Sequence, residues 1–152
     1  MTTSAIDLLS QLIQTPSFSR DEAAAADIIE QFIASHHHTP HRHGNNVWAL
    51  SPRWHDDRPT ILLDAHIDTV RPTPRSLRLS SSATGTEHPI LLRTQQLGLK
   101  PFGSPTLSNQ ALIPFPSIKI GPGQSARSHT ADEFILVSEI KQAIELYTKL
   151  LQ

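Results

Sequence analysis

The spacing of apolar residues predicts helices in four parts of the chain. In these segments apolar side chains recur every three or four positions, as on the face of a helix that packs against a core. The predicted helices are residues 4–14, 20–35, 88–97 and 138–151. Ser19 and Glu22 have the spacing of a capping box at the start of the second helix, and Gly98 is placed to end the third.

Continuous apolar runs predict strands. The strongest candidate is residues 61–68, an apolar run that ends in polar side chains. A run that is apolar on both faces favours a covered, central place in an α/β sheet. Weaker candidates are residues 47–50, 77–79 and 118–120. We therefore expect an α/β layer architecture, in which the helices at the two ends of the chain pack on the 61–68 strand.

Composition narrows the class of protein. A chain of 152 residues with 38% hydrophobic and 18% charged residues suits one globular domain. The formal net charge of −1 predicts neither a nucleic-acid nor an anionic-membrane partner, because both require a concentrated basic face. With no cysteine, no secretory leader pattern and no apolar run near the roughly 20 residues of a membrane span, we expect a cytoplasmic protein. Any metal must be bound by histidine and carboxylate.

A histidine and an aspartate stand at the end of the strongest predicted strand. In open α/β sheets, ligands bind outside the carboxyl ends of the strands. His66 and Asp68 would point to the same side of a strand, so Asp68 could support a metal-bound His66. The motif alone is short, and an ordinary surface pair is the simpler interpretation of it.

A second polar cluster precedes the last predicted helix. It contains His129, Asp132 and Glu133, after a glycine-containing turn. Without further information His129 would be an ordinary loop histidine. The two acidic residues would be charges that favour the positive end of the helix dipole.

Five histidines lie within residues 36–43. Closely spaced imidazoles can chelate transition-metal ions. Because this segment connects a predicted helix to a predicted strand, we expect adventitious metal binding or none.

Three long segments, in the same order along the chain, resemble the zinc-dependent aminoacylase and deacetylase family, which includes acetylornithine deacetylase and succinyl-diaminopimelate desuccinylase. The first is residues 60–70, TILLDAHIDTV. The others, most similar to the acetylornithine deacetylase branch, are residues 101–112, PFGSPTLSNQAL, and 119–135, KIGPGQSARSHTADEFI. The resemblance extends over nearly all of residues 4–152.

The resemblance implies a three-layer zinc-peptidase-like catalytic domain. It implies hydrolysis of an N-acetyl amino acid such as N-acetylornithine, in arginine biosynthesis, with two zinc ions or, as the alternative, cobalt. His66 corresponds to a ligand of one metal ion and His129 to a ligand of the other. Asp68 corresponds to the catalytic carboxylate that supports the first metal site, and Glu133 is a candidate for the shell of residues around the ligands.

The chain departs from the family in its middle. No acidic residue lies between Asp68 and Glu87. The bridging aspartate, the glutamate pair that includes the general base, another acidic ligand and the inserted dimerisation domain therefore have no counterpart. The junction falls near Pro74–Arg75, so that residues 1–74 and 75–152 would form one shortened catalytic domain. Weak or absent zinc binding and no hydrolysis by this chain alone are expected. The alternatives are a non-catalytic interaction protein and a deletion remnant without a selected function.

Overall fold

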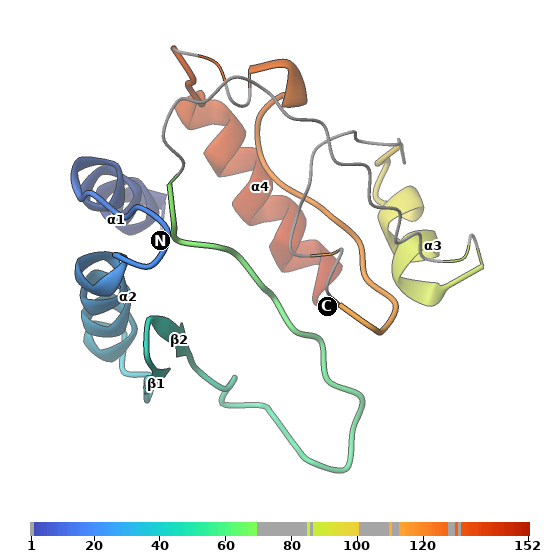
Figure 1. The fold of residues 1–152 in the computed structure, drawn as a ribbon. Helices are drawn as coiled ribbons and strands as arrows, with labels where there is room; N and C mark the ends of the chain where they lie inside the picture. Colours follow the sequence, from blue (N-terminus) through green and yellow to red (C-terminus); the bar gives the residue numbers. More distant parts are fainter. Residues whose placement is uncertain are drawn as a thin grey trace. The chain divides into compact units, whose positions relative to one another are not determined.

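In the computed structural model, helices and strands lie in two separate parts of the chain (Figure 1). It describes residues 2–69, 85, 87–100, 110, 113–127, 130 and 132–152. The chain divides into two compact units, which consist largely of Thr3–Arg71 and Pro72–Gln152. The union of 1–74 and 75–152 in one domain stays a prediction.

Two helices begin the first unit, where the apolar spacing predicted them. Helix α1 spans Thr2–Gln14 and helix α2 spans Ala23–Ser35. Ala25 and Ala26 of α2 are 1% and 0% exposed, so small side chains form the buried centre of this unit. Thus the predicted helices 4–14 and 20–35 are confirmed, within two or three residues at their starts.

The predicted capping box is wrong. Glu22 itself is the N-cap of α2 and makes no side-chain capping bond to the helix. Its carboxylate instead accepts hydrogen bonds from the Arg20 backbone N–H at 2.6 Å and from Asn45 Nδ2 at 2.8 Å. Ser19 donates to Asp68. A tertiary contact has therefore replaced the local bond that the spacing predicted.

A small antiparallel hairpin follows α2. Strands β1, His41–His43, and β2, Asn46–Trp48, pair with His41 opposite Trp48. Gly44 turns the chain with a φ of 60°, a conformation that costs glycine little. The hairpin is tied to α2, because Arg42 of β1 forms ion pairs with Asp27 and Glu30.

The predicted central strand at residues 61–68 is wrong. These residues form no strand, and the bridge nearest to them is an isolated parallel one between Phe18 and the next residue, Thr69. Ile61, Leu62 and Leu63 are 58%, 63% and 67% exposed. A central strand requires a partner on each side. Among the described residues the only two strands pair with each other.

The second unit contains two further α-helices, both predicted. Helix α3 spans Pro89–Gln96; Pro89 occupies its first turn, and Gly98 follows its end with a φ of 85°. Helix α4 spans Val137–Leu150. The two helices are joined where Arg93 Nη2 donates to the Lys149 carbonyl at 2.9 Å.

Other strand predictions fare differently. Residues 118–120 are irregular, so that prediction is wrong, and 77–79 lie outside the described residues. The predicted strand 47–50 is confirmed only as part of β2. The described residues combine helices with a two-stranded sheet, which agrees with the α/β class in general. Among them no helix is both long and apolar enough to cross a membrane.

Candidate functional site

The side chains of His66, Asp68 and Ser19 form a hydrogen-bonded cluster in the first unit. His66 Nδ1 lies 3.0 Å from Asp68 Oδ1 and 3.0 Å from the Asp68 backbone oxygen. Ser19 donates its hydroxyl to the other carboxylate oxygen, Oδ2. The predicted pairing of His66 with Asp68 is present, although the strand that was expected to carry it is not.

The geometry around His66 assigns different tasks to its two ring nitrogens. Both oxygens beside Nδ1 are hydrogen-bond acceptors, so Nδ1 carries the hydrogen of the neutral ring. Nε2 then holds the lone pair. Because 67% of the His66 side chain is exposed, a metal ion in solution can approach it.

The turn after α1 holds the cluster in place. The Thr69 backbone N–H donates to the Ser17 carbonyl at 2.7 Å, beside the Phe18–Thr69 bridge. Ser17 is only 2% exposed. This contact anchors the end of the 61–68 segment against the chain between α1 and α2, which places Asp68 within reach of Ser19.

Two of the carboxylates near this turn, Asp68 and Glu22, are ionised at neutral pH. The Ser19 hydroxyl, and after it His66, lower the pKa of Asp68 below its ordinary value. The Arg20 backbone N–H and the Asn45 amide lower the pKa of Glu22. Asp68 and Glu22 therefore accept hydrogen bonds as carboxylates in this region.

The cluster resembles half of a metal site. A carboxylate behind the Nδ1 of an imidazole is the usual support for metal binding at Nε2. However, catalytic zinc sites use about three protein ligands. In the described parts of the chain no group of three or more histidine, aspartate or glutamate side chains is arranged to hold a metal ion. The described donors alone therefore do not fit the implied pair of zinc ions.

The second half of the predicted site belongs to the second unit of the chain. His129 lies outside the described residues, and Glu133 is an exposed residue of the second unit, before α4. Nearby, Thr130 donates to the Arg127 carbonyl at 2.7 Å, and Arg127 forms an ion pair with Glu139 of α4. The roles of His129 and Glu133 stay predictions.

The histidine-rich segment is used partly for local packing. The imidazole of His36 lies against Phe32 with ring centroids 4.1 Å apart, and His41 stacks on Trp48 at 5.6 Å. A shallow hollow is lined by His37, His38 and His41 together with Thr39, Leu50 and Pro52. These imidazoles do not converge on one point that would hold a metal ion.

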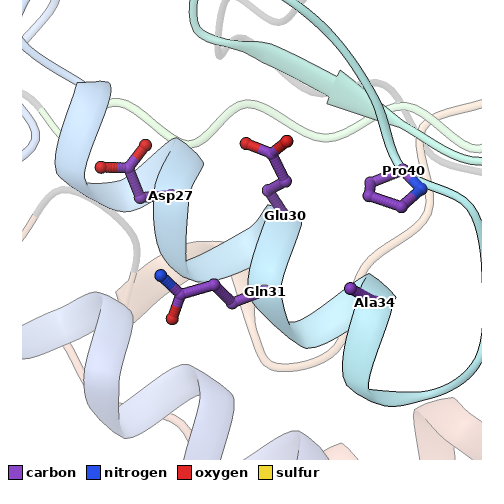
Figure 2. A pocket seen from close by; sticks show the side chains of 5 residues that line it. All are labelled: Asp27, Glu30, Gln31, Ala34 and Pro40. Carbon is purple, nitrogen blue, oxygen red and sulfur yellow. The ribbon is translucent and has the colours of Figure 1, made fainter.

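A second hollow lies between α2 and the loop before β1 (Figure 2). It is lined by Asp27, Glu30, Gln31, Ala34 and Pro40. Figure 2 shows the carboxylates of Asp27 and Glu30 on the same side of α2. Because Arg42 bonds both carboxylates, at 2.5 and 2.8 Å, it offsets one of their two negative charges, and the hollow is lined by residues that attach the hairpin to α2.

Sequence reasoning missed Ser19 as a member of the cluster. Its local spacing to Glu22 matched a helix cap, while its partner Asp68 lies 49 residues away. No sequence signal connects the two positions.

Comparison with known proteins names no relative: no family model matches the chain, and no curated protein matches it.

Proposed function

We propose that this chain is a shortened relative of the metal-dependent N-acyl-amino-acid deacetylases that does not catalyse the reaction by itself. The observation that supports the proposal is the His66–Asp68 pair. Asp68 accepts the hydrogen bond of Nδ1, so Nε2 is the nitrogen that would bind a metal ion, on a side chain that is 67% exposed. Together with the three long segments that resemble the family, this orientation favours an origin in a metal site.

The rest of the hypothesis is based on the proposed lineage. The three-layer zinc-peptidase-like fold, the cytoplasmic location and a substrate such as N-acetylornithine in arginine biosynthesis follow from the resemblance. In the proposed site His66 would bind one metal ion, zinc or cobalt, and His129 the other. Bound metal ions would polarise the amide carbonyl and lower the pKa of water.

The same hypothesis explains why we expect no catalysis. The stretch between Asp68 and Glu87 contains no acidic residue, so it offers no general base. A general base raises the rate of such reactions about 10²–10⁴-fold. The side chains that would hold two metal ions together are missing as well. The chain keeps residues that would bind and orient one metal ion, without those that would move the proton of the attacking water.

The test is release of ornithine from N-acetylornithine with saturating zinc or cobalt. We expect the rate to equal the rate without protein, in the unmodified chain and in the His66→Ala and Glu133→Gln variants. An intact deacetylase of the family serves as the positive control. Turnover by the unmodified chain that is lost in both variants would show that Glu133 acts as the base, and the inactive relative would have to be abandoned.

A second candidate, a non-catalytic interaction protein, is favoured by a different observation. Ile61, Leu62 and Leu63 are consecutive, large and more than half exposed. Large exposed apolar patches mark interaction sites. The two candidates are separable, because substitution of His66 affects metal binding, whereas substitution of Leu63 affects association.

A further inference from the structure

We propose that His41 and His43 of strand β1 bind one divalent transition-metal ion of the copper(II) class, on the face of the hairpin that is turned away from α2. The inference does not depend on the proposed deacetylase lineage, because neither residue is among the metal ligands that the resemblance implies. It rests on the alternation of side chains in β1, on the attachment of the hairpin to α2 and on the neutral residues beside the pair.

The alternation of side chains is the first observation. Successive side chains of a strand point to opposite faces, so His41 and His43 share one face of β1 and Arg42 lies on the other. The exposure of the residues follows the same pattern, because both histidines are exposed and Arg42 is partly buried. Both imidazoles are therefore accessible to an ion in solution from the same side of the strand.

The attachment of Arg42 decides which face the histidines occupy. Its guanidinium forms ion pairs with Asp27 and Glu30 of α2, at 2.5 and 2.8 Å. Because Arg42 is held against the helix, the histidines on either side of it are directed away from α2. Pairing with β2 keeps this segment extended. A strand held in this way presents the two rings at lower entropic cost than a flexible loop would.

The spacing of the two histidines suits ligands of one ion. Alternate residues of an antiparallel strand are about 6.8 Å apart along its axis. On a helix, two histidines at i and i+4, whose Cβ atoms are about 5–6 Å apart, bind a single zinc ion in metalloproteases. The separation in β1 is only slightly larger, and rotation about the side-chain bonds can bring the two rings together. A ring nitrogen of His41 and one of His43 can therefore bind the same ion.

The residues that face the pair across the hairpin carry no charge. Trp48 lies opposite His41 and stacks on it, with ring centroids 5.6 Å apart, and Asn46 lies opposite His43. The positive charge of Arg42 is on the other face, where two carboxylates bind it. A cation beside the two imidazoles would therefore meet no positive side chain of the hairpin on its own face.

Two imidazole ligands favour copper(II) over zinc. Imidazole binds copper, nickel and zinc, and for a given set of ligands the affinity is highest for copper(II). Copper(II) also prefers a tetragonal site, in which two neighbouring nitrogens leave the other positions to water. In the described parts of the chain no third histidine, aspartate or glutamate completes a metal-binding group, so water would supply the remaining ligands.

Quenching of Trp48 fluorescence by copper(II) tests the site, because the indole lies beside the ring of His41. The chain has two tryptophans, so Trp54→Phe leaves Trp48 as the reporter. The tag-free parent for the titration also carries His66→Ala, so that an ion at His66 does not contribute. Excess glycine competes for weakly bound copper. Quenching should saturate at one copper ion per chain.

In this parent, His43→Ala should raise the dissociation constant for copper(II) at least about tenfold, since even the loss of a residue that only supports a ligand costs about that much. His41→Ala should have the same effect. His38→Ala is the matched control, because it removes another imidazole of the histidine-rich segment from a position outside β1. Absence of saturable quenching, or an unchanged constant in His43→Ala, would overturn the proposal. An equal loss in His38→Ala would also overturn it, by showing adventitious chelation by the whole segment.

Thermal unfolding provides the second arm. An ion that binds the folded strand stabilises the folded chain by mass action. Copper(II) should therefore raise the unfolding midpoint of the parent and of His38→Ala, and raise it less in His43→Ala. Circular dichroism without metal checks that the variants are folded. An equal rise in all three proteins would mean that the ion does not bind the histidine pair of β1.

Discussion

At the scale of single residues, the Ser19–Asp68–His66 cluster shows how one hydroxyl can define the state of a site. Ser19 donates to the Asp68 oxygen that does not face His66. Asp68 is therefore bonded on both oxygens, which stabilises its ionised form and fixes the ring of His66. The orientation of the imidazole thus depends on a serine from the turn after α1.

Removal of the Ser19 hydroxyl should raise the pKa of Asp68, because this bond is the largest cause of its lowered value. A lowered pKa contributes stability that is present above the unfolded value of about 3.9 and is lost as the pH falls through the folded value. Ser19→Ala should therefore reduce the free energy of unfolding at pH 7 and have less effect at the lowest pH.

The measurement is an NMR titration of the Asp68 carboxyl carbon, combined with urea unfolding at several pH values. Ser10→Ala on the exposed side of α1 is the control. If the titration of Asp68 were the same in both variants, the Ser19 hydroxyl would not bond the carboxylate in solution.

At the scale of elements, the hairpin and the helices depend on different kinds of information. Helices α1, α2, α3 and α4 end within a few residues of the predicted limits. Their bonds and caps are local, as at Gly98 after α3. The β1–β2 hairpin also has a local turn, but it needs Arg42 to reach Asp27 and Glu30 on α2.

Gly44→Ala should destabilise the protein by about 1 kcal/mol, because a side chain at a φ of 60° strains the backbone. A Cβ there would meet no atom within 4 Å, so the cost is conformational and not a clash. Gly44→Asn should cost less, since asparagine tolerates this conformation. Thermal or urea unfolding measures the difference.

The control for this prediction is Gly121→Ala. A Cβ at Gly121 also meets open space, but the backbone there has no positive φ. This substitution should be neutral or slightly stabilising. An equal loss of stability at both glycines would mean that the turn at Gly44 does not need its left-handed conformation.

At the scale of the whole molecule, the residues predicted to bind metal ions come from both units of the chain. His66 belongs to the first unit, while Glu133 belongs to the second, together with residue 129. A site with few ligands binds zinc weakly, whereas structural zinc sites gain about 10–16 kcal/mol. We expect a dissociation constant weaker than about 1 μM, which corresponds to about −8.2 kcal/mol.

Calorimetric titration of a tag-free sample with zinc measures this affinity. His66→Ala should weaken it, whereas His55→Ala, a change at another exposed histidine, should not. Tight binding of two zinc ions that is lost in both His66→Ala and His129→Ala would contradict the prediction and require further ligands.

The sequence by itself determined the four α-helices of the described residues and indicated the pairing of His66 with Asp68. Both depend on neighbours a few positions away, through helical spacing, glycine at helix ends and the i, i+2 separation of two side chains. Only the tertiary structure decided that residues 61–68 lack strand partners and that Ser19 bonds Asp68 instead of capping α2. A strand is stabilised by hydrogen bonds to other segments, so its formation depends on which segments the chain can bring beside it.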